Sequence, residues 1–288
     1  DYTPVVMRPT LYLSDLDGTL LDEKGEVSER TRAGLTALID AGILFSVASA
    51  RSYFSIKKLF GDLDIRLPII EFNGAFITDY KTGEHLEINS LGRELGEEVF
   101  DRILGRGVRP FVCSFNGSED CLHYDELVNP GMEWYEKRRR DAGDSRLRRT
   151  PALRETMKED VVSLTVMAQD EARIRALHEE FRELYGNALQ LYCYENEYSK
   201  GTFWLTIHHE NASKHIAMKR LRDLVAPGAQ IAAFGDNVND LLMLEHADRA
   251  IAVENAVPEL LEKAHQVIPH HGLHSVVEFL ENDFFKKG

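Results

Sequence analysis

Two aspartates that could share a cation, Asp15 and Asp17, lie in the stretch DLDGTLLD, directly after the apolar, β-prone run Thr10-Leu11-Tyr12-Leu13. Ligands of α/β sheets bind beyond the carboxyl ends of the strands, so we expect the pair at such an edge, with Gly18 letting the chain turn away. Carboxylates this close repel each other unless a cation lies between them, and a hard, oxygen-liganded ion such as Mg²⁺ suits them best. Taken alone, the stretch is explained equally well as an Asx-rich turn.

Polar side chains also follow two other predicted strands. These strands are the apolar runs 43–48 and 231–234, and their ends carry Ser49 and Arg51, and then Asp236, Asn239 and Asp240. Lys214 stands at the start of a predicted helix. Parallel strands would bring all of these residues to one edge of a sheet. Carboxylates for a hard cation, beside a hydroxyl and an ammonium for an anion, favour phosphoryl transfer.

The elements that must position these residues alternate between strands and helices. Ser28 is predicted to cap a helix that ends near Gly42, a second helix is predicted over 53–60, and residues 68–72 read as a further strand. Strands separated by helical patterns predict right-handed βαβ units. The predicted fold class is therefore α/β, with a Rossmann-like, mostly parallel sheet as its core.

The regular alternation is interrupted after Asn73. Residues 75–79 and 84–88 flank Lys81-Thr82-Gly83, which predicts a hairpin, and mixed helices and strands follow until the alternation resumes at Asn211. We expect residues 1–81 and 210–288 to form a discontinuous core and residues 82–209 an inserted α+β domain. The basic run from Lys137 to Arg149 within this insertion is predicted to be a solvated helix face.

Composition limits the classes of function. The formal net charge of −14 argues against non-specific nucleic-acid binding, but a local cation can still attract a phosphorylated substrate. The three cysteines lack zinc-type spacing and are expected to be free thiols in a reducing compartment. No apolar run is long enough to span a membrane and no basic-then-apolar signal pattern is present at the start, so a cytoplasmic location is expected. The oligomeric state cannot be predicted from this sequence.

Four segments, in order, resemble a known set of motifs. DLDGTLLD, ASAR, Lys214 and GDNVNDLLML resemble the motifs of the haloacid dehalogenase-like phosphatase superfamily. The insertion, after EFNGA and before NASK, resembles that of the Cof-type branch, whose α+β cap controls substrate access. The resemblance implies a Mg²⁺-dependent phosphatase for small phosphomonoesters. Sugar phosphates are favoured, with nucleotides, flavin mononucleotide and pyridoxal phosphate as alternatives; a phosphotransferase or mutase of the same superfamily and a non-catalytic sensor are the competing functions.

The resemblance also implies individual roles. Asp15 resembles the nucleophile that forms an aspartyl-phosphate, and Asp17 the acid that protonates the leaving alcohol and then activates water. Mg²⁺ would be held by the Asp15 carboxylate, the Asp17 backbone carbonyl and Asp236. The remaining positions carry supporting roles: Ser49 and Lys214 as the phosphate clamp, Asn239 as a further donor, and Asp240 as a partner of Lys214 or of a metal-bound water.

Several assignments stay open at this stage. Ser49 could merely cap the following helix, and Arg51 could contact substrate or pair with a core carboxylate. The late histidines His270, His271 and His274 are expected to be solvated loop residues rather than metal ligands. The segment YCYENEYSKG offers candidates for substrate recognition but could equally be a surface hairpin with half-buried tyrosines; the candidates are Tyr192, Tyr194, Glu195, Glu197, Tyr198 and Lys200.

Overall fold

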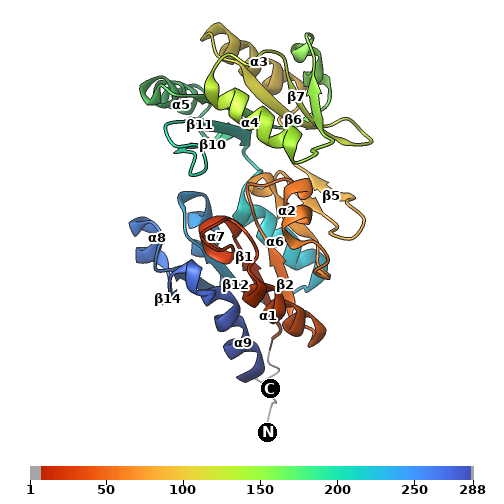
Figure 1. Ribbon diagram of the computed structural model, residues 1–288, viewed down its shortest axis with the longest axis vertical. Coiled ribbons are helices and arrows are strands. Elements are labelled where there is room, and N and C mark those ends of the chain that lie inside the picture. Colours follow the sequence, from red (N-terminus) through yellow and green to blue (C-terminus); the bar gives the residue numbers. More distant parts are fainter. Residues whose placement is uncertain (1–7, 287–288) are drawn as a thin grey trace. The chain divides into compact units, whose positions relative to one another are not determined.

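The computed structural model describes residues 8–286, which divide into two compact units (Figure 1). One unit contains the chain up to Glu87 and again from Ser213 onward, and the other contains Ile88–Ala212. The sequence predicts these boundaries at 81/82 and 209/210. Within residues 8–286, no helix has the length and apolar character needed to cross a bilayer.

The discontinuous unit is built on a five-stranded parallel sheet in the order β14-β13-β12-β1-β2. Its strands are β1 (Thr10–Ser14), β2 (Leu44–Val47), β12 (Gln230–Gly235), β13 (Arg249–Val253) and β14 (Gln266–Ile268). Its helices are α1 (Glu29–Asp40), α2 (Tyr53–Phe60), α6 (Lys214–Val225), α7 (Leu241–Glu245), α8 (Pro258–Lys263) and α9 (Ser275–Lys286). The predicted parallel α/β fold class is confirmed.

Burial explains why β1 lies inside this sheet. Strands of a parallel sheet are covered on both faces and therefore read as continuous apolar runs. Leu11 and Leu13 are fully buried, and β1 pairs with β12 on one side (Leu11 with Ile231) and with β2 on the other (Leu11 with Leu44). The carboxyl ends of these three strands therefore lie at the same edge of the sheet.

A small antiparallel sheet follows at the end of the first half of this unit. It contains β3 (Ile69–Glu71), β4 (Phe76–Thr78) and β5 (His85–Ile88) in that order. A parallel bridge between Ala48 and Ile70 aligns β3 with the end of β2. The turn between β3 and β4 is thereby held beside the residues that follow β2.

The inserted unit contains a six-stranded mixed sheet in the order β10-β11-β9-β6-β7-β8. The strands are β6 (Pro110–Phe115), β7 (Asp120–Tyr124), β8 (Leu147–Arg149), β9 (Asp160–Ala168), β10 (Leu189–Glu195) and β11 (Phe203–His209). The helices are α3 (Arg93–Gly105), α4 (Pro130–Asp141) and α5 (Glu171–Tyr185). All pairs are antiparallel except β7 with β8.

The basic run from Lys137 to Arg149 is not one solvated helix face, so that prediction was wrong. Helix α4 ends at Asp141, and the run continues into the short strand β8. Arg146 is buried, and its guanidinium binds the Asp144 carboxylate at 2.7 Å. A charge-run pattern cannot reveal such pairing, because the partner carboxylate sits inside the same segment.

Candidate active site

The loop that follows β1 turns sharply at the edge of the parallel sheet. Asp15 is buried, and its backbone N–H continues the ladder by donating to the Phe234 carbonyl at 3.0 Å. Gly18 adopts φ 75°, and a Cβ atom built there would lie 2.4 Å from the Asp236 Oδ2 atom. A side chain at this position would therefore meet both backbone strain and a collision, so glycine is required for the loop to approach the end of β12.

A buried lysine joins two of the predicted acidic residues. The Nζ atom of Lys214, the first residue of α6, donates to Oδ1 of Asp15 and to Oδ1 of Asp240, each at 2.6 Å. Lys214 is fully buried. Burial by itself would lower its pKa, but the Asp15 and Asp240 carboxylates outweigh that effect and hold the pKa of Lys214 above its ordinary value. The ammonium is therefore permanently charged at neutral pH.

Both carboxylate oxygens of Asp240 accept hydrogen bonds that position neighbouring groups. Its Oδ1 atom binds Lys214, while its Oδ2 atom accepts the backbone N–H groups of Asp236 at 3.1 Å and Asn237 at 3.2 Å. Asp236 in turn accepts a hydrogen bond from the Thr19 hydroxyl at 2.8 Å. The loop after β12 and the loop after β1 are thus tied together by side chains.

Three carboxylates gather around this single ammonium. Asp15, Asp236 and Asp240 each place an oxygen within 4.8 Å of the other two. Burial, followed by the charge of Asp240, raises the pKa of Asp15 well above its ordinary value and that of Asp236 to about 7. Both oxygens of Asp240 are engaged, so Asp15 and Asp236 are the carboxylates best placed for a cation. An all-oxygen donor set with excess negative charge fits a hard divalent ion such as Mg²⁺.

Ser49 lies two residues beyond β2 and is fully buried. Its Oγ atom accepts the backbone N–H of Arg51 at 3.0 Å, which leaves the hydroxyl hydrogen to donate elsewhere. The N-cap of α2 is Ser52, whose side chain accepts from the Ser55 N–H. The alternative that Ser49 caps this helix is therefore wrong.

Arg51 pairs with a core carboxylate. Its guanidinium binds Asp17 through two parallel hydrogen bonds, Nε to Oδ2 at 2.7 Å and Nη2 to Oδ1 at 2.5 Å. Both side chains are partly exposed, at 19% for Arg51 and 26% for Asp17. The Asp17 carboxylate is thereby held by Arg51 in a fixed orientation.

The turn between β3 and β4 supplies two positioning residues that the sequence analysis did not assign. Asn73 adopts φ 57°, and its Oδ1 atom accepts from Asn239 Nδ2 at 3.0 Å. Gly74 has φ 105°, and a Cβ atom built there would lie 2.5 Å from the Ser213 carbonyl oxygen. The turn therefore orients the Asn239 amide and lets the start of α6, and with it Lys214, approach closely. The Asn-Gly dipeptide in EFNGA, which is typical of turns, was the available sequence signal.

The late histidines His270, His271 and His274 lie in the turn before α9, as predicted, but they are half-buried and not fully solvated. His271 Nδ1 hydrogen-bonds the Leu21 carbonyl at 2.7 Å, and its backbone N–H donates to Asn255, whose amide donates to the Gly18 carbonyl at 2.8 Å. His274 Nδ1 lies 3.0 Å from the Ser28 hydroxyl. These hydrogen bonds support the loop after β1. The partners lie far apart in the sequence, so residue spacing does not reveal the contacts.

The YCYENEYSKG segment, residues 192–201, forms the end of β10 and the loop that leads to β11 in the inserted unit. Tyr192 packs its ring edge on His208, and Tyr194 lies tilted against Trp204. Tyr198 lies under the Arg138 guanidinium. The segment is thus part of a hairpin, and its tyrosines pack within their own unit; a role in substrate recognition stays a prediction.

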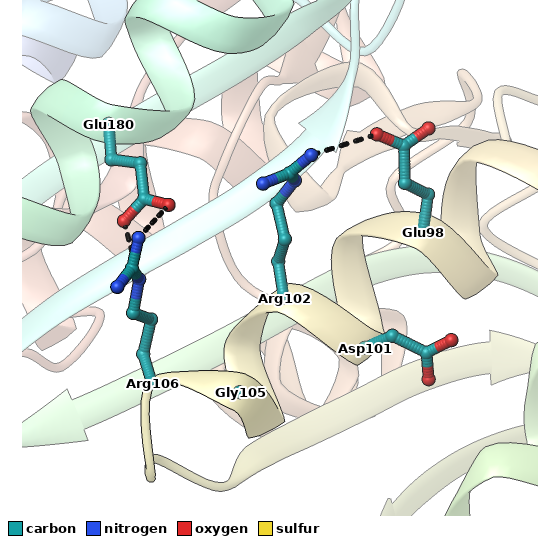
Figure 2. Close-up of a pocket in the computed structure, with 6 residues that line it drawn as sticks. All are labelled: Glu98, Asp101, Arg102, Gly105, Arg106 and Glu180. Atoms are coloured by element: carbon teal, nitrogen blue, oxygen red, sulfur yellow. Dashed lines mark hydrogen bonds and ion pairs between the residues drawn. The ribbon is translucent and has the colours of Figure 1, made fainter.

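A pocket on the inserted unit is less suited to bind a phosphomonoester than the carboxylate cluster around Lys214. It is lined by Glu98, Asp101, Arg102, Gly105, Arg106 and Glu180 (Figure 2). Arg106 binds Glu180 at 2.6 Å, and Arg102 lies 3.6 Å from Glu98. Both arginines are already paired with carboxylates, and the lining carries no nucleophile beside a base.

Comparison with known proteins agrees with this arrangement. A family model described as haloacid dehalogenase-like hydrolase matches residues 12–280, and the chain belongs to that family. It is 28% identical to the 5-amino-6-(5-phospho-D-ribitylamino)uracil phosphatase YwtE of Bacillus subtilis, over 93% of this chain and 95% of that protein. It is 24% identical to YitU of the same organism, which carries the same phosphatase name, over 96% and 98% of the two chains.

A solved structure shares the fold across both units. The haloacid dehalogenase-like hydrolase from Bacteroides thetaiotaomicron aligns with a TM-score of 0.78 and 21% identity, covering 96% of this chain and all of that one. The predicted family and the predicted enzyme class, a phosphatase, are confirmed by these comparisons.

Proposed function

We propose that the protein is a Mg²⁺-dependent phosphatase that hydrolyses small phosphorylated metabolites through an aspartyl-phosphate on Asp15. The observation that carries the proposal is the contact between the Asp15 carboxylate and the fully buried Lys214, at 2.6 Å, beside the carboxylate of Asp236. A carboxylate held at a strand end next to a fixed positive charge is suited to attack an electrophile that carries negative oxygens.

The proposed metal ligands are the Asp15 and Asp236 carboxylates and the backbone carbonyl of Asp17. When bound, Mg²⁺ supplies charge neutralisation at the phosphoryl oxygens. The raised pKa of Asp236, about 7, supports this assignment, because its burial and the nearby Asp240 charge penalise an ionised carboxylate that has no cation beside it.

In the proposed reaction, Lys214, the Ser49 hydroxyl and the Asn239 amide donate hydrogen bonds to the phosphoryl oxygens. An Asp15 oxygen bonds to phosphorus as the bond to the leaving oxygen breaks, and Asp17 gives its proton to the departing alkoxide. Asp17 then takes a proton from water, which attacks phosphorus and releases phosphate and free Asp15. Arg51 orients the Asp17 carboxylate through two hydrogen bonds, at 2.5 and 2.7 Å, and one of the two oxygens has to carry the proton when Asp17 serves as the acid.

We propose sugar phosphates as the principal substrates, and the inserted domain, predicted over 82–209, as the part that governs substrate access. Two relatives are named for 5-amino-6-(5-phospho-D-ribitylamino)uracil, which carries its phosphate on a polyol chain. That compound is therefore a specific candidate beside hexose and pentose phosphates. The polar residues near the end of β10, such as Glu195, are candidates for reading the leaving group.

The test is phosphate release with Mg²⁺ across a panel that includes these sugar phosphates, the ribitylamino compound, nucleotides, flavin mononucleotide and pyridoxal phosphate. We expect turnover of at least one sugar or polyol phosphate, loss of turnover in Asp15→Asn, and loss on chelation. Full turnover by Asp15→Asn would refute the proposal. In isotopically labelled water, label in the released phosphate indicates hydrolysis, whereas a product phosphorylated on a second hydroxyl indicates a phosphotransferase.

A further inference from the structure

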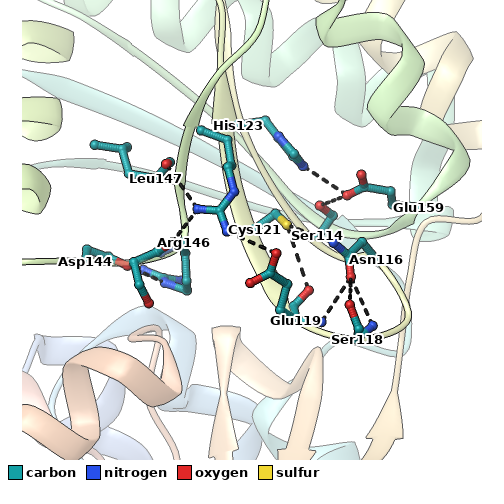
Figure 3. Close-up of polar contacts among 12 residues, drawn as sticks. Ser114, Asn116, Ser118, Glu119, Cys121, His123, Asp144, Arg146, Leu147 and Glu159 are labelled. Carbon is teal, nitrogen blue, oxygen red and sulfur yellow. Dashed lines mark hydrogen bonds and ion pairs between the residues drawn. The ribbon is translucent and has the colours of Figure 1, made fainter.

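Three side chains of the inserted unit converge beside β7: Cys121, His123 and Glu159 (Figure 3). Cys121 and His123 are two residues apart on β7, so their side chains share one face of the sheet. Glu159 comes directly before β9. The strand between them, β6, presents Ser114, which is the register partner of Cys121.

The ligand atoms of this cluster are already close. Cys121, His123 and Glu159 each offer one atom within 4.8 Å of the other two. His123 Nε2 lies 3.0 Å from Glu159 Oε2, and the Ser114 hydroxyl donates to the same oxygen at 2.5 Å. In a tetrahedral zinc site, nitrogen and oxygen ligands are separated by about 3.3 Å, so the His123–Glu159 pair already has nearly the spacing of two zinc ligands.

Burial distinguishes this cluster from an ordinary surface group. Cys121 and His123 are 3% and 8% exposed, while the Glu159 side chain is 25% exposed and keeps one side open to water. Among residues 8–286, the other ring nitrogen of His123, Nδ1, is buried without a hydrogen-bond partner. His123 faces Glu159 through Nε2, which is therefore the ring nitrogen that an ion between the two side chains would contact.

The sulfur of Cys121 makes only weak contacts in its present surroundings. Its distances are 3.5 Å to Asn116 Nδ2 and 3.9 Å to the Glu119 carbonyl oxygen. The thiol's own donated contact, at 3.9 Å, is long, so little is lost if the thiol exchanges its hydrogen for a metal.

We propose that Cys121, His123 and Glu159 bind a zinc ion, with a water molecule as the fourth ligand. Thiolate and imidazole together select zinc over magnesium or calcium, and one thiolate with one carboxylate neutralises a divalent charge. Binding forms a zinc–sulfur bond and releases the Cys121 thiol proton to solvent. Because this proton is released on binding, the affinity for zinc should increase with pH.

The zinc ion would cross-link β7 to the start of β9, across β6. Because the metal binds the folded arrangement of these three residues, it should stabilise the inserted unit. This inference is independent of the proposed phosphatase mechanism, because none of the three residues belongs to the carboxylate cluster around Lys214.

The test is titration of the full chain with Co²⁺, which replaces zinc and gives a thiolate-to-cobalt charge-transfer band in the near ultraviolet. Cys113, Cys121 and Cys193, the cysteines of the sequence, all lie in the inserted unit, so the band cannot arise from the Asp15 cluster. We expect one Co²⁺ with this band per chain, and its displacement by Zn²⁺.

Variants separate the site from chance binding. We expect Cys121→Ser to abolish the band, Glu159→Gln to weaken Co²⁺ affinity at least about tenfold, and the matched control Cys193→Ser to leave both unchanged. No band in the wild type, a band that persists in Cys121→Ser, or unchanged affinity in Glu159→Gln would each overturn the proposal. Glu159→Gln keeps the thiol, so it remains decisive if Cys121→Ser fails to fold by circular dichroism.

Discussion

Replacing Lys214 with methionine tests the electrostatic account of the site most severely. The side chain is fully buried, and its Nζ atom contacts Asp15 and Asp240 at 2.6 Å each. Methionine fills a similar volume but carries no charge, so packing changes little. The substitution leaves three carboxylates within 4.8 Å of one another without their ammonium.

The magnitude follows from the cost of an unpaired buried charge. Removing one partner of a buried ion pair destabilises a protein by about 3–5 kcal/mol. We expect Lys214→Met to lose this much unfolding free energy in urea when Mg²⁺ is chelated at about pH 8, because few protons are then available to neutralise the carboxylates that have lost their ammonium. We also expect kcat/KM to fall by about 10²–10³-fold, because one fixed positive donor to the phosphoryl group is missing.

Two control variants separate charge at the site from charge in general. Lys219→Met removes an ammonium from the same helix outside the cluster, and should leave stability and activity nearly unchanged. Adding Asp240→Asn to Lys214→Met removes both partners of one pair, and should recover part of the stability but none of the activity. If Lys214→Met unfolds within about 1 kcal/mol of wild type and keeps its kcat/KM, the reasoning fails.

Other predictions concern the loops and the proton. Gly74 has φ 105°, and an added Cβ would collide at 2.5 Å, so Gly74→Ala should lower the free energy of unfolding in urea by about 2–3 kcal/mol and lower activity. The control Gly92→Ala, at φ 70° with open space around it, should lower the free energy of unfolding by about 1 kcal/mol without loss of activity. Asp236 has a pKa of about 7 in the folded protein against an ordinary 3.8. Its contribution to the stability of the metal-free protein is therefore full at low pH and is lost as pH rises through about 7. Thermal unfolding in the presence of a chelator should show this decline in stability, and the Asp236→Asn variant should lack the decline. Arg51→Gln should slow hydrolysis of alkyl phosphates about tenfold more than that of p-nitrophenyl phosphate, because only the alkyl leaving group needs the proton of a well-oriented Asp17; an equal loss for both would mean that Arg51 binds the phosphoryl group instead.

The sequence predicted the parts of the molecule that depend on local pattern. The buried run at β1, the Ser28 cap of α1 and the bounds of α2 follow from hydrophobic period and capping chemistry, and the structure confirms them. Because the strands are parallel, the polar residues at their ends had to share one edge, which brings Asp15 within reach of Asp236.

The contacts that the sequence did not predict are set by tertiary packing. Asn73 orients Asn239 across 166 positions of the chain, and His271 supports the loop after β1 across 250. The pairing of Arg51 with Asp17 was one of two alternatives, because a guanidinium at a strand end suits a carboxylate and a phosphate equally well. Arg146 was misassigned for a related reason: a charge run shows the charge, not its buried partner.

The most direct test of the central claim is to trap the intermediate on Asp15. Wild-type protein is mixed with Mg²⁺ and its best substrate, quenched in acid within a single turnover, digested and measured by mass spectrometry. We predict a peptide containing Asp15 that is heavier by one phosphoryl group, and no such peptide in Asp15→Asn. A phosphoryl group on another residue, or rapid single-turnover hydrolysis by Asp15→Asn, would contradict the account.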